Sequence, residues 1–158
     1  MTLRNSQRGR SSRSPAVRVA TVADVPSLFD VRTSVVENYQ SVEELARLGV
    51  TLESVADMLR SNSRAWVGEE DDHVVAFSMA NAAEATVFAM FVRPGSDGQG
   101  WGRALMIEAE HWLFDRGCEE IWLLTDGPAI SFYQHLGWRN EGVQTDGQTR
   151  FTKRRDSA

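Results

Sequence analysis

Three glycines at alternate positions, Gly98, Gly100 and Gly102, have a spacing that points to chemistry. They follow a strand-like run and precede a helix-like run, so the backbone N–H groups around them have no partner within the helix. Such amides bind anions, because a missing side chain lets a phosphate approach the main chain and the helix dipole adds positive potential. The loop therefore predicts an anion cradle, and a merely flexible loop stays the alternative.

Two other nucleotide-binding patterns do not fit this loop. Counting from Gly98 and Gly100, the dinucleotide pattern Gly-x-Gly-x-x-Gly needs a third glycine where Arg103 stands. A nucleotide P-loop that begins at Gly95 needs a lysine where Trp101 stands. The sequence excludes both kinds of site.

Two segments resemble motifs of the GCN5-related N-acetyltransferase (GNAT) family. The run FVRPGSDGQGWGRAL, residues 91–105, resembles its acetyl-CoA-binding motif Gln/Arg-x-x-Gly-x-Gly/Ala. The run AISFYQHLGW, residues 129–138, resembles its signature A-x-x-F-Y-x-x-x-G-F/W. The chain departs from the family at Asp97, in place of Gln or Arg, and at Asp126, where an Asn is often found. The resemblance spans about residues 16–152.

The resemblance implies a fold and a co-substrate, acetyl-CoA. We expect an α/β (α+β) fold, with a mixed, mostly antiparallel sheet of about seven strands, helices on both faces, and strands four and five splayed apart. The thioester lies in this gap, where a backbone N–H polarises its carbonyl, while β-strand main chain pairs with the pantetheine and loop amides hold the pyrophosphate. The expected cofactor-binding residues are Phe91, Val92, Arg93, Gly98, Gln99, Gly100, Trp101, Gly102 and Arg103.

Acyl transfer to an amine moves one proton off nitrogen and one onto sulfur. The family match predicts Tyr133 as the acid, since a phenol can donate to a departing thiolate; a core tyrosine packed on Phe132 is the alternative. Glu84, at the start of a predicted strand, is the candidate base, or else a solvated strand-end glutamate. Glu37 and Asn38, at the end of the first predicted helix, are candidates to bind the acceptor's ammonium, or else a surface pair.

The remaining reactive side chains give no site. Cys118 is the single cysteine and falls at a predicted turn, so burial is favoured over an acyl-enzyme role. His73, His111 and His135 have no acid partner at a diagnostic spacing. No Cys/His cluster has the spacing of a zinc site, so we expect no metal, and the cysteine count favours a reducing cytoplasm.

Hydrophobic periodicity predicts the elements that position these residues. The run EIWLLT is almost continuously apolar, which is typical of a central parallel strand. Caps and turn residues mark most of the boundaries. The expected strands are 16–22, 65–70, 73–81, 84–92, 120–125, 138–143 and 148–153, and the expected helices are 25–39, 42–49, 51–60, 104–116 and 128–138.

Length and composition fit one globular domain, with 158 residues of which 42% are apolar and 25% charged. We expect an Arg/Ser-rich disordered leader at 1–15, a single domain at 16–153 and a tail at 154–158; nucleic-acid contact or targeting stays open for the leader. No apolar run approaches the roughly 20 residues that cross a bilayer, and no secretory signal is visible. Membrane insertion and export are therefore not expected.

The charge is unevenly distributed. Of 17 Lys and Arg residues, four (Arg4, Arg8, Arg10 and Arg13) lie in the leader, which leaves 13 basic against 22 acidic residues. An acidic body argues against nucleic acid as the main partner and weakly favours cationic small molecules.

We predict an acetyl-CoA-dependent N-acetyltransferase that acts on a primary amine of a small molecule, by direct attack in a ternary complex. The alternatives are a non-catalytic acyl-CoA-binding or regulatory module and a protein lysine or N-terminal acetyltransferase. Edge strands near the C-terminus make a homodimer a further expectation.

Overall fold

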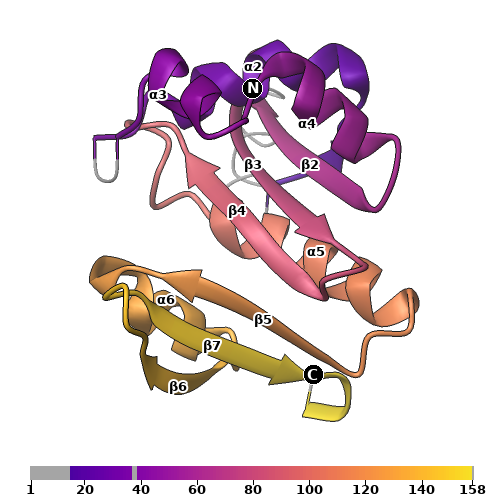
Figure 1. Cartoon of the computed structure of the whole chain (residues 1–158), viewed down its shortest axis with the longest axis vertical. Helices are drawn as coiled ribbons and strands as arrows, with labels where there is room; N and C mark the ends of the chain where they lie inside the picture. Colours follow the sequence, from indigo (N-terminus) through magenta and orange to yellow (C-terminus); the bar gives the residue numbers. More distant parts are fainter. Residues whose placement is uncertain (1–14, 37–38, 158) are drawn as a thin grey trace, which may run out of the picture.

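A seven-stranded sheet organises the molecule, in the order β1-β2-β3-β4-β5-β7-β6 (Figure 1). The computed structural model describes residues 15–36 and 39–157. Only the β4–β5 pair is parallel, which confirms the mixed, mostly antiparallel sheet expected above. The strands are β1 Val17–Val19, β2 Ser63–Glu70, β3 His73–Asn81, β4 Thr86–Val92, β5 Glu120–Thr125, β6 Arg139–Val143 and β7 Thr149–Arg154.

Helices cover both faces of the sheet, as expected. Helices α2 and α4 bury Leu28 and Val55 against one face, and α5 buries Leu105 and Leu113 against the other. The helical elements are η1 Val22–Asp24, α2 Val25–Arg32, α3 Val42–Arg47, α4 Leu52–Leu59, α5 Trp101–Asp115, η2 Gly127–Ala129, α6 Ile130–His135 and η3 Arg155–Ser157.

Short helices near the start of the chain begin at side-chain caps. Ser41 Oγ accepts from Glu44 N at 3.1 Å, and the Glu44 carboxylate accepts from Ser41 N at 2.9 Å. Thr51 and Ser54 exchange the same pair of hydrogen bonds at the start of α4. Each of these two capping boxes provides acceptors for two backbone amides that a helix start leaves without partners, so both helix starts follow from the local sequence.

The helix expected at 25–39 is wrong in its second half, because α2 ends at Arg32. In a continuing helix the Val31 carbonyl would accept from Val35 N. Instead Ser34 donates to it twice, from N at 3.1 Å and from Oγ at 2.6 Å, and this local hydroxyl bond competes with helix propagation. The expected first strand is also shortened, to β1.

β4 and β5 meet at one end only. Their Cα pairing is limited to Thr86 with Trp122. Trp122 forms three hydrogen bonds that hold the start of β4 to β5. Its N donates to Ala85 O (3.1 Å), its indole Nε1 donates to Glu84 O (2.9 Å), and its O accepts from Thr86 Oγ1 (2.7 Å). From Val87 on, β4 pairs with β3 alone, so the strands diverge toward their carboxyl ends (Figure 1). The predicted splay between the fourth and fifth strands is confirmed.

Three further findings concern the described ranges. None of the helices there is long and apolar enough to cross a bilayer. His, Cys, Asp and Glu side chains nowhere gather in threes around a possible metal site within 15–36 and 39–157. The leader expected at 1–15 lies outside the described residues, apart from Pro15.

Candidate functional site

The glycine loop leads directly into α5. Gly100 is the N-cap, with φ 89° and ψ 6°, a left-handed conformation that favours glycine. The helix begins at Trp101, three residues earlier than the sequence predicts, and Ala104 N donates to Gly100 O at 3.1 Å. The six backbone N–H groups of residues 98–103 have no acceptor in the described part of the chain. Six consecutive amides at the start of a 15-residue helix are the arrangement that an anion cradle requires, and anion binding by this loop stays a prediction.

Close packing fixes the first turn of α5. A Cβ on Gly68 of β2 would lie 2.3 Å from the ring of Trp101, so this glycine makes room for a tryptophan that is buried in the core. A Cβ on Gly102 would lie 3.0 Å from Phe132 Cζ and 3.3 Å from Met90 Cε. Gly102 therefore serves the packing of α5 on α6 and β4 as well as access to its amide. No local motif in the sequence marks Gly68.

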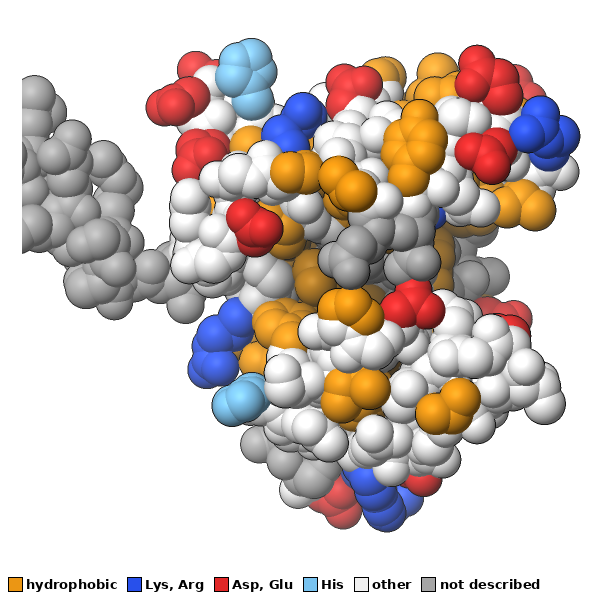
Figure 2. Space-filling model, turned by 90° about the vertical axis from the view of Figure 1, so that its left-hand side faces the viewer, with side chains coloured by type: hydrophobic (Ala, Val, Ile, Leu, Met, Phe, Trp, Pro, Cys, Tyr) orange, Lys and Arg blue, Asp and Glu red, His pale blue; other side chains and the backbone are white. Residues whose placement is uncertain are grey.

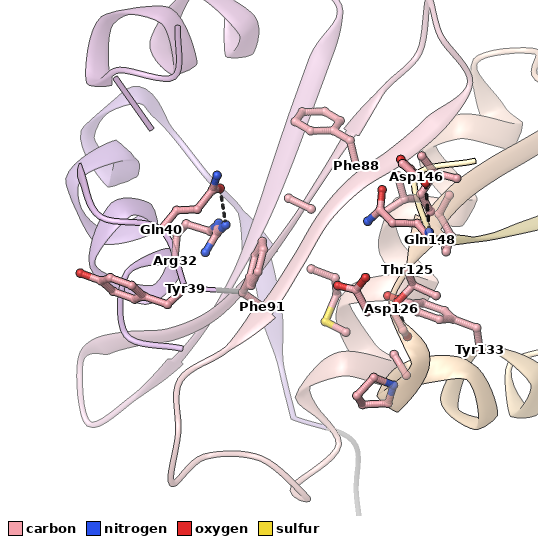
Figure 3. A pocket seen from close by; sticks show the side chains of 17 residues that line it. Arg32, Tyr39, Gln40, Phe88, Phe91, Thr125, Asp126, Tyr133, Asp146 and Gln148 are labelled. Carbon is pink, nitrogen blue, oxygen red and sulfur yellow. Dashed lines mark hydrogen bonds between the residues drawn. The ribbon is translucent and has the colours of Figure 1, made fainter. Parts of the chain in front are cut away.

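A cavity of about 930 Å³ opens where β4 and β5 diverge. Figure 2 faces this opening and shows a notch between the upper and lower parts of the molecule, with hydrophobic side chains around it. β4 and β5 border it, and segments from elsewhere in the chain contribute most of the polar side chains (Figure 3). The polar side chains of the lining are Arg32, Tyr39, Gln40, Thr125, Asp126, Tyr133, Asp146 and Gln148.

The register of β4 decides which of its backbone groups face the gap. Arg93 N donates to Val75 O of β3 at 2.7 Å, and in an antiparallel pair this orientation repeats every second residue. The main chain of Phe91 therefore also faces β3, and that of Val92 and Met90 faces the gap. Of the three residues predicted to pair with pantetheine, Val92 has the suitable orientation. A β-bulge leaves Phe88 without a partner on β3.

Tyr133 of α6 lies both in the core and on the cavity wall. Its ring packs edge-on against Phe132, with centroids 4.9 Å apart, and lies tilted against Phe151, with centroids 5.8 Å apart. No described side chain or carbonyl forms a hydrogen bond with its hydroxyl. Burial raises the pKa of Tyr133 to about 12. The two interpretations of the sequence are thus compatible, although Tyr133 is a weaker acid than a free phenol.

The other predicted site residues lie apart from the cavity or outside the described ranges. Glu84 is exposed in the turn before β4. Its carbonyl accepts a hydrogen bond from Trp122 Nε1 at the end where β4 and β5 are paired. It is not among the cavity residues, so its role as a base stays a prediction without geometric support. Glu37 and Asn38 lie outside the described residues.

The cavity also contains charged residues that sequence reasoning did not select. Arg32 Nη2 donates to Gln40 Oε1 at 2.7 Å, and its guanidinium lies 4.6 Å from the centroid of Phe91. Lost solvation lowers the pKa of Arg32.

Asp126 and Asp146 line the cavity as well. One signal pointed to Asp126: it directly follows a strand whose carboxyl end borders the predicted gap, and ligands of α/β sheets bind at such ends.

A buried ion pair connects α5 with the end of α6. Lys153 Nζ of β7 lies 2.8 Å from Glu110 Oε1 of α5 and donates to Leu136 O at 2.8 Å. Trp138 Nε1 donates to Glu110 Oε2 at 2.8 Å, and the Trp138 ring packs edge-on against Tyr133. The helix that carries Tyr133 is thereby tied to the helix that begins at the cradle.

Comparison with known proteins agrees with this geometry. A histone acetyltransferase of Glycine max is 32% identical over 82 residues, 49% of this chain and 36% of the relative. The chain thus spans about a third of the length of the curated relatives it matches. PaiA N-acetyltransferase from Thermoplasma acidophilum, solved with coenzyme A, has a TM-score of 0.75 at 19% identity, with 90% of this chain and 99% of that chain covered. A GNAT superfamily phosphinothricin acetyltransferase from Sinorhizobium meliloti, solved with acetyl-CoA, has a TM-score of 0.74 at 16% identity, with 90% and 89% covered.

The family model gives the assignment. Residues 28–138, from α2 through the cradle to the end of the second motif, match the model of the acetyltransferase (GNAT) family. The chain therefore belongs to the acetyltransferase (GNAT) family.

Proposed function

We propose that this protein is an acetyl-CoA-dependent N-acetyltransferase that acetylates a primary amine of a small molecule, by direct attack in a ternary complex. One observation carries the proposal: six backbone amides without an acceptor among the described residues stand at the N-terminus of α5, and a large cavity opens at the splay of β4 and β5. The coenzyme A and acetyl-CoA found in two proteins of similar fold support the same ligand here.

The residues present fit the donor molecule. The amides of residues 98–103 would hold its diphosphate, since the cradle offers N–H donors and a helix dipole without needing a lysine. The main chain of Val92 and Met90 would pair with its pantetheine amides. Acetyl-CoA, as a substrate, supplies the acyl group as a thioester.

Two groups of the chain would stabilise the transfer. A backbone N–H near the bulge at Phe88 is the candidate to polarise the thioester carbonyl, and losing one such donor costs about 2.7–4 kcal/mol in barrier. Tyr133 is the candidate acid. With a pKa of about 12 it stays protonated at neutral pH. It would therefore act by donating a hydrogen bond to the developing thiolate rather than by transferring its proton to the sulfur.

Binding is the first test. Acetyl-CoA at one hundred times its dissociation constant should stabilise the protein by about 2.7 kcal/mol, which raises Tm by several degrees for a domain of this size. An unchanged melting curve at saturating acetyl-CoA would contradict both the enzyme and the non-catalytic module.

Turnover separates these two functions. Thiol release from acetyl-CoA is measured with 2-phenylethylamine, spermidine, glucosamine, L-lysine and a histone-tail peptide; the peptide is included because one relative is named a histone acetyltransferase. Release with a small amine supports the proposal. Release with the peptide alone would favour a protein acetyltransferase, and binding without release for every amine would favour the module.

A further inference from the structure

The cavity lacks an obvious base at the position the sequence predicted, because Glu84 lies outside it. Among the described residues, Asp126 and Asp146 are the carboxylates that line the cavity. A group that receives a proton from the acceptor must reach the bound amine, so the choice among the described carboxylates lies between these two.

Position and burial distinguish the two carboxylates. Asp126 directly follows β5, is half-buried, and in Figure 3 projects across the cavity toward β4 from the wall that also carries Tyr133. Asp146 is exposed in the β6–β7 turn, where its Oδ1 accepts from Gln148 N at 3.0 Å. Solvent screens an exposed charge more strongly than a half-buried one. Asp126 is therefore the stronger site for an ammonium beside the splay.

We propose that the carboxylate of Asp126 binds the ammonium of the acceptor and receives its proton. This inference rests on the proposed N-acetyltransferase function. The first proton leaves the ammonium through Asp126 to solvent, and the neutral nitrogen attacks the thioester carbon. The N–C bond forms, the C–S bond breaks, and the second nitrogen proton follows the same route. Tyr133 donates a hydrogen bond to the departing thiolate, which takes a proton from solvent, so one proton is released per turnover.

Asp126 lies apart from the arginine of the cavity lining. Arg32 and Gln40 lie on the side of the cavity opposite Asp126 (Figure 3). Phe88 and Phe91 of β4 lie between the side that carries Arg32 and the side that carries Asp126, and they offer apolar contact. These features favour a compact primary amine with an apolar portion.

The test compares two nucleophiles in Asp126→Asn, which has nearly the shape of the native side chain and restores the amide often found in the family. The nucleophiles are the fastest alkylamine of the panel, charged at neutral pH, and hydroxylamine, uncharged there. Asp57→Asn, which removes an exposed carboxylate of α4, is the matched control, and Asp146→Asn tests the general field of the cavity. Tm and the dissociation constant of acetyl-CoA are measured for every variant.

We expect Asp126→Asn to lower kcat/KM for the alkylamine by about 100-fold, the lower end for general base catalysis, with at most a threefold loss for hydroxylamine. Affinity for acetyl-CoA should change less than about threefold, and Asp57→Asn should match the wild type. Equal losses for both nucleophiles, no loss at all, or an equal loss in Asp146→Asn would overturn the assignment to Asp126. A wild type that binds acetyl-CoA but releases no thiol would instead overturn the proposed function, and the inference with it.

Discussion

Tyr133 belongs to the core and is also the proposed acid of the reaction. Its ring is held by three aromatic neighbours, Phe132, Trp138 and Phe151, and its hydroxyl has no hydrogen-bond partner among the residues described. Desolvation favours the neutral phenol, which is why its pKa rises to about 12. A group that acts as an acid is competent below its pKa, so Tyr133 remains competent across the neutral and moderately alkaline range.

Tyr133→Phe should therefore lower kcat by about 100-fold, because the hydrogen bond to the departing sulfur is lost while the ring packing remains. The factor should be constant from about pH 6 to 10, since neither form of the enzyme titrates at this position in that range. Stopped or continuous thiol assays across this range check the ratio. A ratio that shrinks toward alkaline pH, or rates equal to the wild type, would remove Tyr133 from the mechanism.

At the scale of elements, the ion pair of Lys153 and Glu110 connects the end of α6 to α5. The buried network joins Glu110 of α5, Lys153 of β7 and the carbonyl of Leu136 at the end of α6, and it also includes the indole of Trp138. A buried ion pair adds little net stability over apolar residues, but removing one partner leaves an uncompensated charge.

Lys153→Met should thus destabilise the protein by about 3–5 kcal/mol. The double variant Lys153→Met with Glu110→Gln should recover most of this loss, because the glutamine is neutral and still offers an oxygen to Trp138 Nε1. Urea unfolding of the wild type, the single and the double variants measures the difference. A double variant as unstable as the single one would show that packing, and not the unpaired carboxylate, causes the loss.

Element boundaries differ from expectation where local hydrogen bonds outweigh periodicity. α5 begins at Trp101 rather than Ala104, because Gly100 caps it in a left-handed conformation that hydrophobic spacing does not reveal. α2 stops at Arg32, because Ser34 occupies the carbonyl of Val31. The helix starts at Ser41 and Thr51 were predictable, since each cap lies within four residues of its partner.

At the scale of the whole molecule, the sequence predicts sites formed by one continuous segment and misses sites whose residues come together only in the folded chain. The cradle is one loop, so its glycines identify it, and two motifs in the right order predict the splayed sheet. Arg32, Asp126 and Asp146 come from three distant segments, so no local spacing unites them. Glu84 was placed at the start of the strand that borders the gap, but the splay opens at the other end of that strand.

The splay also predicts how the whole molecule responds to its ligand. β4 and β5 share one Cα pair, so a bound coenzyme A should link the two parts of the sheet and give acceptors to loop amides that have none among the described residues. Hydrogen exchange measured with and without coenzyme A should slow at residues 98–103 and at Met90 and Val92, and stay unchanged in α4, which does not line the cavity. Pantetheine, which lacks the diphosphate, should protect Met90 and Val92 but not the loop. Protection of the loop by pantetheine, or none there by coenzyme A, would contradict the assignment of the diphosphate to the start of α5.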